Sequence, residues 1–367
     1  MSHLRHHPRH HLRHHLRRTL TALVTAGLAV TLLGPASDAA APKSSPAGHG
    51  GTWLAGQLRA GLIHNGQFHV DDYGLSADTA LALKALGHHP QALTDIRKAL
   101  AQHVDDYTTY RKDRYAGPIA KLLVVAEDNG AAIHDFGGVD LVTRLENRVS
   151  TVPATLGRIQ DKSDFGDYAN TVGQVFAVRG LITAGSASAT PALGFLLQQQ
   201  CPTGYFRLDF ADTTASDQGC TAQDAPDTDV TALAVVELWS LRDTTPELRA
   251  ALASAVAWLR TQQHDNGSFG GGPTTSAANS NSTGLAAWAL GLAGRCTVAA
   301  KAAGWVRQQQ VQGSLAGTPL AGQGGAVAYD HAALRYATYH GITGPHRDQW
   351  RRATAQAAPG LQYLQGC

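Results

Sequence analysis

Apolar residues recur along the chain in paired helical blocks, and the second block of each pair is apolar on most of its faces. In the clearest pair, a block around residues 195–200 is followed by a polar loop, and an Ala- and Leu-rich block resumes at Asp227. A helix that is apolar all round is expected to be buried, whereas a helix with a polar face lies at the surface. The pattern therefore predicts buried inner helices covered by amphipathic outer helices.

Further pairs precede and follow this one, so that six pairs fill residues 52–367. We expect their second helices to start near residues 78, 117, 170, 227, 282 and 329. The period of roughly 50 residues is typical of helical repeat arrays, and no alternating strand pattern competes with it. The prediction is an all-α fold, an (α/α)6 toroid of six helix hairpins with an inner and an outer ring. An open superhelix is the alternative, but open arrays need polar terminal caps.

The turn inside two of the pairs repeats one order of residue types: an aromatic residue, Gln, Gly and a second aromatic residue. This order is shared by Phe195, Gln200, Gly204 and Phe206 and by Trp258, Gln263, Gly267 and Phe269. Glycine permits the backbone angles of a sharp turn, and a Gln side chain can bond free groups at helix ends. The spacing resembles the QW repeat of the squalene–hopene cyclase and protein prenyltransferase superfamily. The resemblance implies a toroid, here a secreted bacterial member with a single barrel, and by itself specifies no reaction.

The N-terminal segment has the pattern of a secretory signal. His and Arg crowd residues 1–18, residues 20–33 are apolar and uncharged, and small residues follow at 36–41. This order of regions is typical of a cleaved signal peptide, exported by either the Sec or the twin-arginine route. We therefore expect cleavage after residues 1–41, a flexible linker at 42–51, one barrel domain at 52–367, and a secreted protein without stable membrane insertion.

Loss of the signal changes the formal charge of the chain. Residues 1–41 hold five Arg and one Asp, so the net charge of +2 becomes −2 after cleavage. No basic patch remains that would favour a nucleic-acid partner. The expected partner is a small-molecule ligand or an extracellular protein.

An even number of cysteines in an exported chain predicts disulfides. Cys201 and Cys220 flank one loop and are expected to pair, which leaves Cys296 to pair with Cys367. Four cysteines allow three pairings, and the sequence alone leaves all three open. A zinc site is not expected, because no two cysteines have the short spacing of structural zinc ligands.

Because every inner helix follows the same kind of turn, the inner helices should run parallel, with their N-termini at one mouth of the ring. Helix N-termini favour negative charge and hydrogen-bond acceptors. The candidate ligand-binding residues at this mouth are Asp78, Tyr115, Tyr168, Asn170, Asn281, Tyr329 and His331. The alternative for each Asp and Asn is a helix N-cap, which bonds backbone amides and does nothing more.

One motif at this mouth points to catalysis. Residues 227–232 resemble the Asp-x-Asp-Asp-Thr-Ala box of class II terpene cyclases, whose middle Asp protonates an alkene or epoxide. The resemblance implies Asp229 as the general acid and Asp227 as its neighbour, although Val230 stands where the family has a third Asp. Such chemistry needs a carboxylic acid kept protonated in a dry pocket.

Two other resemblances bear on the function. The segment at His331 resembles the His-bearing zinc segment of the prenyltransferases, but residues 279–284 contain no Asp or Cys ligand, so no metal or cofactor is expected. The helix start Asp78-Thr79-Ala80 resembles those of the secreted cobalamin carriers. We expect a secreted toroid that binds a ligand at its axial mouth without catalysis. The alternatives are a terpene cyclase-like lyase or isomerase that uses Asp229, and an extracellular protein-interaction module.

Overall fold

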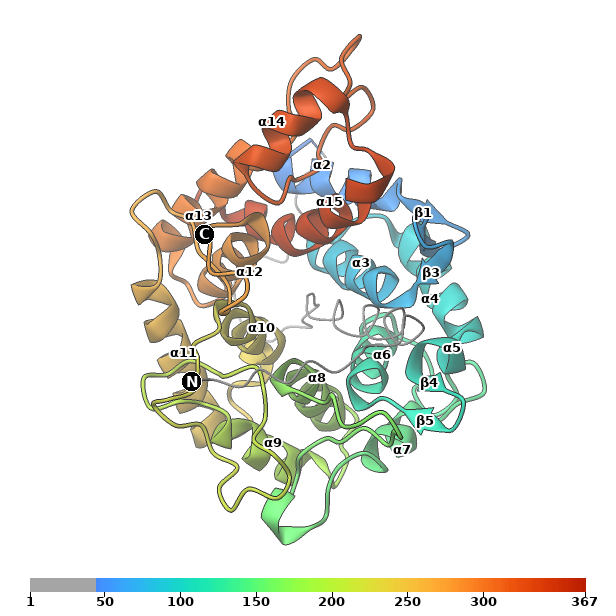
Figure 1. Ribbon diagram of the computed structural model, residues 1–367, viewed down its shortest axis with the longest axis vertical. Coiled ribbons are helices and arrows are strands. Elements are labelled where there is room, and N and C mark those ends of the chain that lie inside the picture. Colours follow the sequence, from blue (N-terminus) through green and yellow to red (C-terminus); the bar gives the residue numbers. More distant parts are fainter. Residues whose placement is uncertain (1–43) are drawn as a thin grey trace, which may run out of the picture.

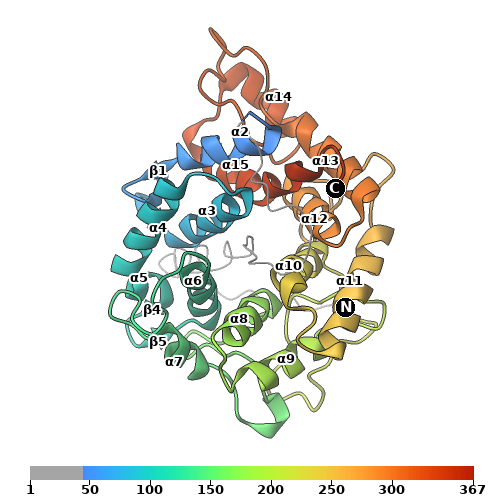
Figure 2. The same ribbon diagram turned by 180° about the vertical axis from the view of Figure 1, so that it is seen from behind.

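A computed structural model describes residues 44–367, and the expected signal peptide at 1–41 lies outside the described residues. In the described part, six helices stand side by side in a ring around the centre of the molecule (Figure 1). They are α3 (Tyr73–Leu86), α6 (Ala116–Asp128), α8 (Thr171–Thr183), α10 (Thr228–Leu238), α12 (Ser280–Leu292) and α15 (Gly344–Ala357). Each packs against its two neighbours, and α15 closes the ring by contacting both α12 and α3. The view from behind shows the same closed ring (Figure 2).

A second layer of helices surrounds this ring. It comprises α2 (Pro46–Ala55), α4 (Pro90–Gln102), α5 (Val104–Thr108), α7 (Leu141–Glu146), α9 (Ala189–Gln198), α11 (Pro246–Thr261), α13 (Cys296–Gln309) and α14 (His331–His340). Short 3₁₀ helices lie at Pro153–Thr155, Trp239–Leu241 and Pro359–Tyr363. The chain is thus predominantly helical, as expected, and has the two concentric layers of an α/α toroid.

Burial separates the two layers as the sequence pattern predicts. Leu285, Trp288 and Leu290 are all buried in the inner helix α12, which has apolar residues on every face. The outer helix α11 instead buries one face through Leu248 and Leu252 and exposes its polar residues. Burial of apolar surface on one face of α11 and all round α12 places the hydrophobic core between the two layers.

The predicted Gln and Gly residues fix the turn between the layers. Gln200 Nε2 donates to the carbonyls of Gly204 and of Ala251 in α11, both at 2.8 Å. Gly204 has a φ of +106°, and a Cβ there would lie 2.7 Å from the Ser254 carbonyl oxygen. The position therefore requires glycine for both its backbone angle and its close approach to the next outer helix. Gln263 repeats these bonds, to the carbonyls of Gly267 and Val298.

The last repeat uses the same device to close the ring. Gln310 Nε2 donates to the carbonyl of Gly325 at 2.9 Å and to that of Pro46, in the first outer helix, at 2.8 Å. The glycine of this turn is Gly325, with a φ of +94°.

A second repeated bond identifies the inner helix in four of the six pairs. The residue that leaves the turn donates its backbone N–H to a hydroxyl of that helix, one turn from its start in α3, α10 and α12 and nearer its end in α15. The pairs are Ile63 with Ser76 at 2.8 Å, Phe206 with Thr231 at 3.0 Å, Phe269 with Thr283 at 2.9 Å and Val327 with Thr354 at 2.9 Å. Thr354 belongs to α15, so the sixth inner helix is α15.

This finding corrects the position of the sixth inner helix. The helix expected near residue 329 exists as α14, but it lies outside the ring at the tip of the molecule (Figure 1). Its residues are mostly exposed, and Tyr339 is 79% exposed. Asp330 caps this helix through the amide of Ala333, so the sequence signal for a helix start was real and only the layer was wrong.

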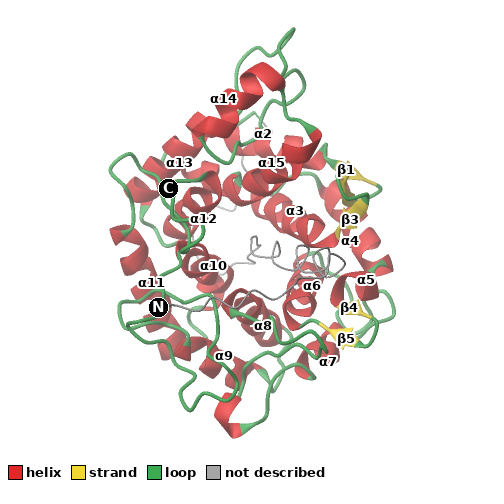
Figure 3. Cartoon of the chain, in the orientation of Figure 1, coloured by secondary structure: helices red, strands yellow, loops and turns green. Residues whose placement is uncertain are grey.

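The structure differs from two further expectations: it contains short strands, and its first inner helix starts earlier than predicted. The described residues include five short strands at the edge of the ring (Figure 3): β1 (Leu58–Arg59), β2 (Leu62–Asn65), β3 (Val70–Asp72), β4 (Thr109–Tyr110) and β5 (Asp113–Arg114). β1–β2–β3 form one antiparallel sheet and β4–β5 another. Because the hairpin at Asn65 ends at Asp72, the first inner helix starts at Tyr73 and not near Asp78.

The linker expected at residues 42–51 is wrong from Pro46 onward. Ser45 caps α2 by accepting the Gly48 amide at 3.0 Å, and α2 then forms part of the outer layer. Pro46 in the first turn supplies the backbone angle that favours a helix start. The ordered domain therefore begins before residue 52.

Both expected cysteine pairs are present. Cys201 is bonded to Cys220 across the loop after α9, and Cys296 at the start of α13 is bonded to Cys367. The second bond ties the C-terminal residue to the outer layer. Among residues 44–367, no helix combines the length and the apolar character that crossing a membrane requires.

Candidate functional site

The inner helices run in the same direction, as expected from their common turn. Asp78 and Lys121 lie at equivalent positions in α3 and α6 and contact each other, and Gly117 and Gly173 meet near the starts of α6 and α8. The starts of these helices are capped by side chains. Asn170 accepts the Gly173 amide at 3.2 Å, and Asp227 accepts the Val230 amide at 3.0 Å. The cap interpretation therefore holds for both residues.

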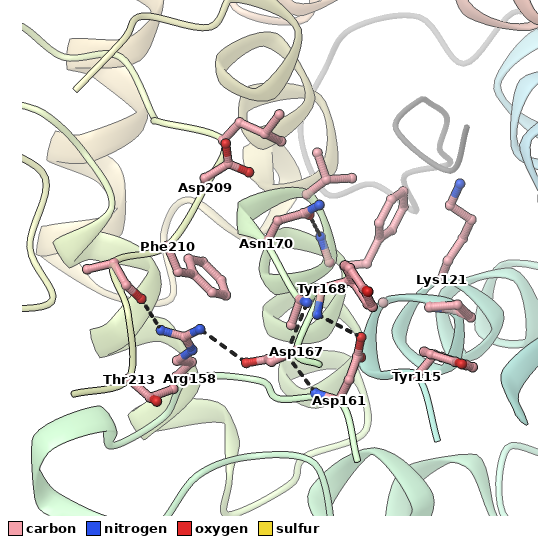
Figure 4. A pocket seen from close by; sticks show the side chains of 18 of the residues that line it. Tyr115, Lys121, Arg158, Asp161, Asp167, Tyr168, Asn170, Asp209, Phe210 and Thr213 are labelled. Atoms are coloured by element: carbon pink, nitrogen blue, oxygen red, sulfur yellow. Dashed lines mark hydrogen bonds and ion pairs between the residues drawn. The ribbon is translucent and has the colours of Figure 1, made fainter. Parts of the chain in front are cut away.

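A cavity of about 930 Å³ lies beside the starts of α6 and α8 (Figure 4). The segment 208–213, which follows the turn at Gly204, forms its other wall. Its lining combines aromatic rings with polar and charged groups: Tyr107, Tyr115, Lys121, Arg158, Asp161, Asp167, Tyr168, Asn170, Phe176, Leu208, Asp209, Phe210, Asp212 and Thr213. The predicted residues Tyr115, Tyr168 and Asn170 thus come together here.

Arg158 holds the outer wall of the cavity. Its guanidinium donates to the Ala211 carbonyl at 2.6 Å, to Gln218 at 3.0 Å and to Asp167 at 3.1 Å, and it lies 4.8 Å from the centre of the Phe210 ring. These bonds join the loop before α8 to the segment 208–213. Arg158 therefore acts as a structural clamp that sets the width of the cavity.

Asp161 organises the floor between the two helices. Its carboxylate accepts the backbone amide of Ala116 at 2.7 Å and that of Tyr168 at 3.1 Å. Burial raises its pKa to about 6, although these two hydrogen bonds act in the opposite direction. Asp161 thus caps α6 from a distant loop, because Tyr115 in the cap position makes no side-chain bond to the helix.

A buried ion pair lies at the inner end of the cavity. Lys121 Nζ lies 2.5 Å from Asp78 Oδ1, and both side chains are almost fully buried. Burial raises the pKa of Asp78 to about 7, although the Lys121 ammonium opposes this rise. Next to the pair, the Tyr107 hydroxyl is buried and has no hydrogen-bond partner among the described residues. The predicted residue Asp78 therefore contributes to the cavity through Lys121.

Asp227 and Asp229 form a separate group at the start of α10. Burial raises the pKa of Asp229 to about 7, and the negative charge of Asp227 adds to this effect. Asp229 Oδ1 is buried without a hydrogen-bond partner among the described residues. A Cβ on Gly271 would lie 2.6 Å from Asp229 Oδ2, and one on Gly272 would lie 2.2 Å from Asp227 Oδ2. A glycine loop therefore covers this pair, which is not part of the cavity lining.

The remaining predicted residues divide between this group and the surface. The Tyr329 carbonyl accepts the Ser280 amide at 2.7 Å, which places Tyr329 at the start of α12, and Asp229 contributes, after burial, to the raised pKa of Tyr329. Asn281 is near the start of α12 and has a buried Oδ1 without a partner among the described residues. His331 is exposed at the start of α14, outside the ring, and lines no part of the cavity. The residues predicted to form one site at the mouth thus fall into two groups, one at the cavity and one around Asp227 and Asp229, and His331 lies apart at the surface.

Several cavity residues were missed by the sequence analysis. Lys121 gave a usable signal, because it interrupts an otherwise apolar inner helix. Arg158 gave none, since it comes from a segment between helices, and Tyr107 gave none, because its helix α5 is too short to show a helical period. Asp209 links the two groups: it lines the cavity, and its charge contributes to the raised pKa of Asp227 after the effect of burial. Among residues 44–367, no three His, Cys, Asp or Glu side chains gather in a way that could hold a metal ion.

Comparisons with known proteins agree on the fold. No protein family model and no curated protein matches the chain. Among solved structures, the type II terpene cyclase MstE from Scytonema is 15% identical with a TM-score of 0.59, covering 86% of this chain and 96% of that one. A UGL variant bound to dGlcA-Glc-Rha-Glc is 12% identical with a TM-score of 0.57, covering 86% and 96%. A glycosidase variant in complex with glucose is 11% identical with a TM-score of 0.52, covering 87% and 96%.

The fold is that of the α/α toroids. At these identities the likeness concerns the fold alone, and unrelated activities share such folds. The function must therefore be argued from the cavity and from the Asp227–Asp229 pair.

Proposed function

We propose that this chain is an exported (α/α)6 toroid, a single-barrel relative of the squalene cyclase and prenyltransferase repeat proteins, that binds a small organic ligand without catalysis. The observation that carries the proposal is the cavity of about 930 Å³ at the mouth formed by the inner helix starts. Its volume falls in the range of small-molecule sites, and its lining mixes aromatic walls with a few fixed polar groups.

The state of three charged groups at the cavity favours binding over catalysis. Arg158 is held by three partners, Asp161 by two backbone amides, and Lys121 by Asp78. A catalytic acid or base must instead reach a reacting atom of the substrate. Charged groups that bond other parts of the protein stabilise the cavity wall, which is what a binding site of fixed shape requires.

Two features support export. The signal-like pattern at the N-terminus precedes a domain with two disulfides, and disulfides persist in oxidising compartments. The order of outer and inner helices along the chain, α2–α3, α4–α6, α7–α8, α9–α10, α11–α12 and α13–α15, supports assignment to the six-hairpin class.

Native mass spectrometry on the protein recovered from its own culture medium tests the proposal. We expect a reproducible adduct that survives mild activation. Leu208→Trp places a large ring in the cavity and should remove the adduct. Leu241→Trp is the matched control, because Leu241 is also half-buried but lies outside the cavity. A bare mass for the unmodified protein would refute ligand binding and would favour the interaction module.

A second candidate function rests on Asp229. Its buried, unpartnered oxygen and a pKa of about 7 suit a general acid of the terpene cyclase type, and MstE, a structural neighbour, is such a cyclase. Incubation with geranylgeraniol and analysis of the extract by gas chromatography–mass spectrometry tests it. Cyclised products that disappear in Asp229→Asn would support catalysis. Their absence from the unmodified protein, or their persistence in the variant, would exclude this role.

A further inference from the structure

The positive charges in the cavity are already matched within the protein. Lys121 is paired with Asp78 at 2.5 Å, and Arg158 with Asp167 at 3.1 Å. Asp209 is an exposed carboxylate at the cavity with no ion-pair partner among residues 44–367. The cavity therefore carries surplus negative charge, which repels an anionic ligand.

The cavity also holds hydrogen-bonding groups that lack protein partners. The Tyr107 hydroxyl is buried and unpartnered among the described residues, and leaving such a donor unsatisfied costs free energy. The Asn170 amide oxygen is used by the Gly173 amide, which leaves the Asn170 amide nitrogen as a donor. Asp209 supplies an acceptor. A ligand that fits must thus both accept and donate hydrogen bonds.

Aromatic rings that are fixed by their neighbours also line the cavity. The Phe210 ring is held edge-on by Phe195, with centroids 5.0 Å apart. The Tyr168 ring is 43% exposed, and its hydroxyl is fixed by a bond of 2.7 Å to the Phe165 carbonyl. The negative face of an aromatic ring attracts weakly positive C–H groups, which a pyranose presents on its less polar face.

We infer that the ligand of this cavity is an uncharged carbohydrate, whose hydroxyls bond Tyr107, Asn170 and Asp209 and whose C–H faces pack on Tyr168 and Phe210. This inference rests on the proposed function and adds the chemical class of the ligand. A purely apolar ligand would leave the Tyr107 hydroxyl and the Asp209 carboxylate without partners. An anionic ligand would approach the surplus of carboxylates.

Isothermal titration calorimetry on the purified protein tests the class. The probes are three uncharged tetrasaccharides, cellotetraose, maltotetraose and chitotetraose, and one anionic tetrasaccharide, tetragalacturonate. We expect at least one uncharged probe to bind about tenfold or more tightly than tetragalacturonate. Equal or tighter binding of tetragalacturonate, or binding of none of the uncharged probes, would overturn the inference.

Two variants locate the binding. Tyr107→Phe should weaken the bound tetrasaccharide about tenfold by removing one buried hydrogen bond, and Leu208→Trp should abolish binding. Tyr339→Phe removes the hydroxyl of an exposed tyrosine on α14 and should leave affinity unchanged. Full affinity in both cavity variants would place the sugar elsewhere and refute the inference.

The outcome separates this inference from the proposed function. If native mass spectrometry shows a non-carbohydrate adduct that Leu208→Trp removes, the carbohydrate assignment fails and ligand binding in the cavity stands. If neither an adduct nor a binding probe is found, both fail.

Discussion

The side-chain amide of Gln310 donates a hydrogen bond of 2.8 Å to the carbonyl of Pro46, which lies 264 residues earlier in the chain. The same amide bonds the Gly325 carbonyl in its own turn. One side chain thus joins the end of α13 to the first outer helix and completes the ring. Without it, both carbonyls would lose a buried partner.

Replacement of Gln310 should therefore loosen the closure. We expect Gln310→Ala to lower the free energy of unfolding by about 1–3 kcal/mol, the cost of leaving buried acceptors unsatisfied. Gln308→Ala is the control, because Gln308 is exposed on the same helix. Urea unfolding followed by circular dichroism measures both. Equal stability of the two variants would show that the bond to Pro46 does not hold the ring closed.

The turn glycines give a second prediction. Gly204→Ala places a Cβ at a φ of +106° and 2.7 Å from the Ser254 carbonyl oxygen. Left-handed backbone and the clash together should cost about 2 kcal/mol or more. Gly194→Ala should do the opposite and stabilise by about 0.5–1 kcal/mol, because Gly194 lies inside α9 with open space around it. A stable Gly204→Ala variant in the same unfolding experiment would contradict the turn geometry.

The turns were predictable because their signal is local. Gln200, Gly204 and Phe206 lie within one short segment, and the spacing recurs at Gln263. The layer to which each helix belongs was harder to predict from the sequence. A cap at Asp330 marks a helix start in either layer, and only the bond from Val327 to Thr354 shows which helix is inside.

The candidate site was predicted only in part, because only some of its residues carry a local sequence signal. Tyr115 and Asn170 stand at starts of inner helices, so the toroid pattern alone places them at the mouth. Tyr107 reaches the cavity from the short helix α5 and Arg158 from a connecting segment, and the position of both depends on packing with distant parts of the chain. Residues that act through such long-range contacts leave no periodic signal in the sequence.

The second disulfide should stabilise the end of the chain. Cys296 and Cys367 are separated by 71 positions, and the bond restricts the unfolded chain. The double substitution Cys296→Ser and Cys367→Ser should lower stability by about 2–4 kcal/mol. Differential scanning calorimetry with and without a reductant measures this. Reductant should then lower the Tm of the unmodified protein more than that of the double variant; equal effects would contradict the prediction.

Buried acids should make the protein more stable in mild acid than in mild alkali. Burial raises the pKa of Asp78, Asp229 and Glu237 to about 7. In the unfolded chain these groups release their protons near their ordinary values, about pH 4. Between about pH 4 and pH 7 the folded state therefore binds more protons, so the free energy of unfolding falls as the pH rises through this interval.

We expect the Tm to be higher at pH 5.5 than at pH 8 by about 5 °C or more. Asp229→Asn removes one of these groups and should reduce the difference, because the amide stays neutral in both states. Asp265→Asn, at an exposed position, is the control and should leave the difference unchanged. A Tm that rises from pH 5.5 to pH 8 would mean that Asp229 and the other buried acids are ionised in the folded protein. The protonated acid required by the second candidate function would then be absent.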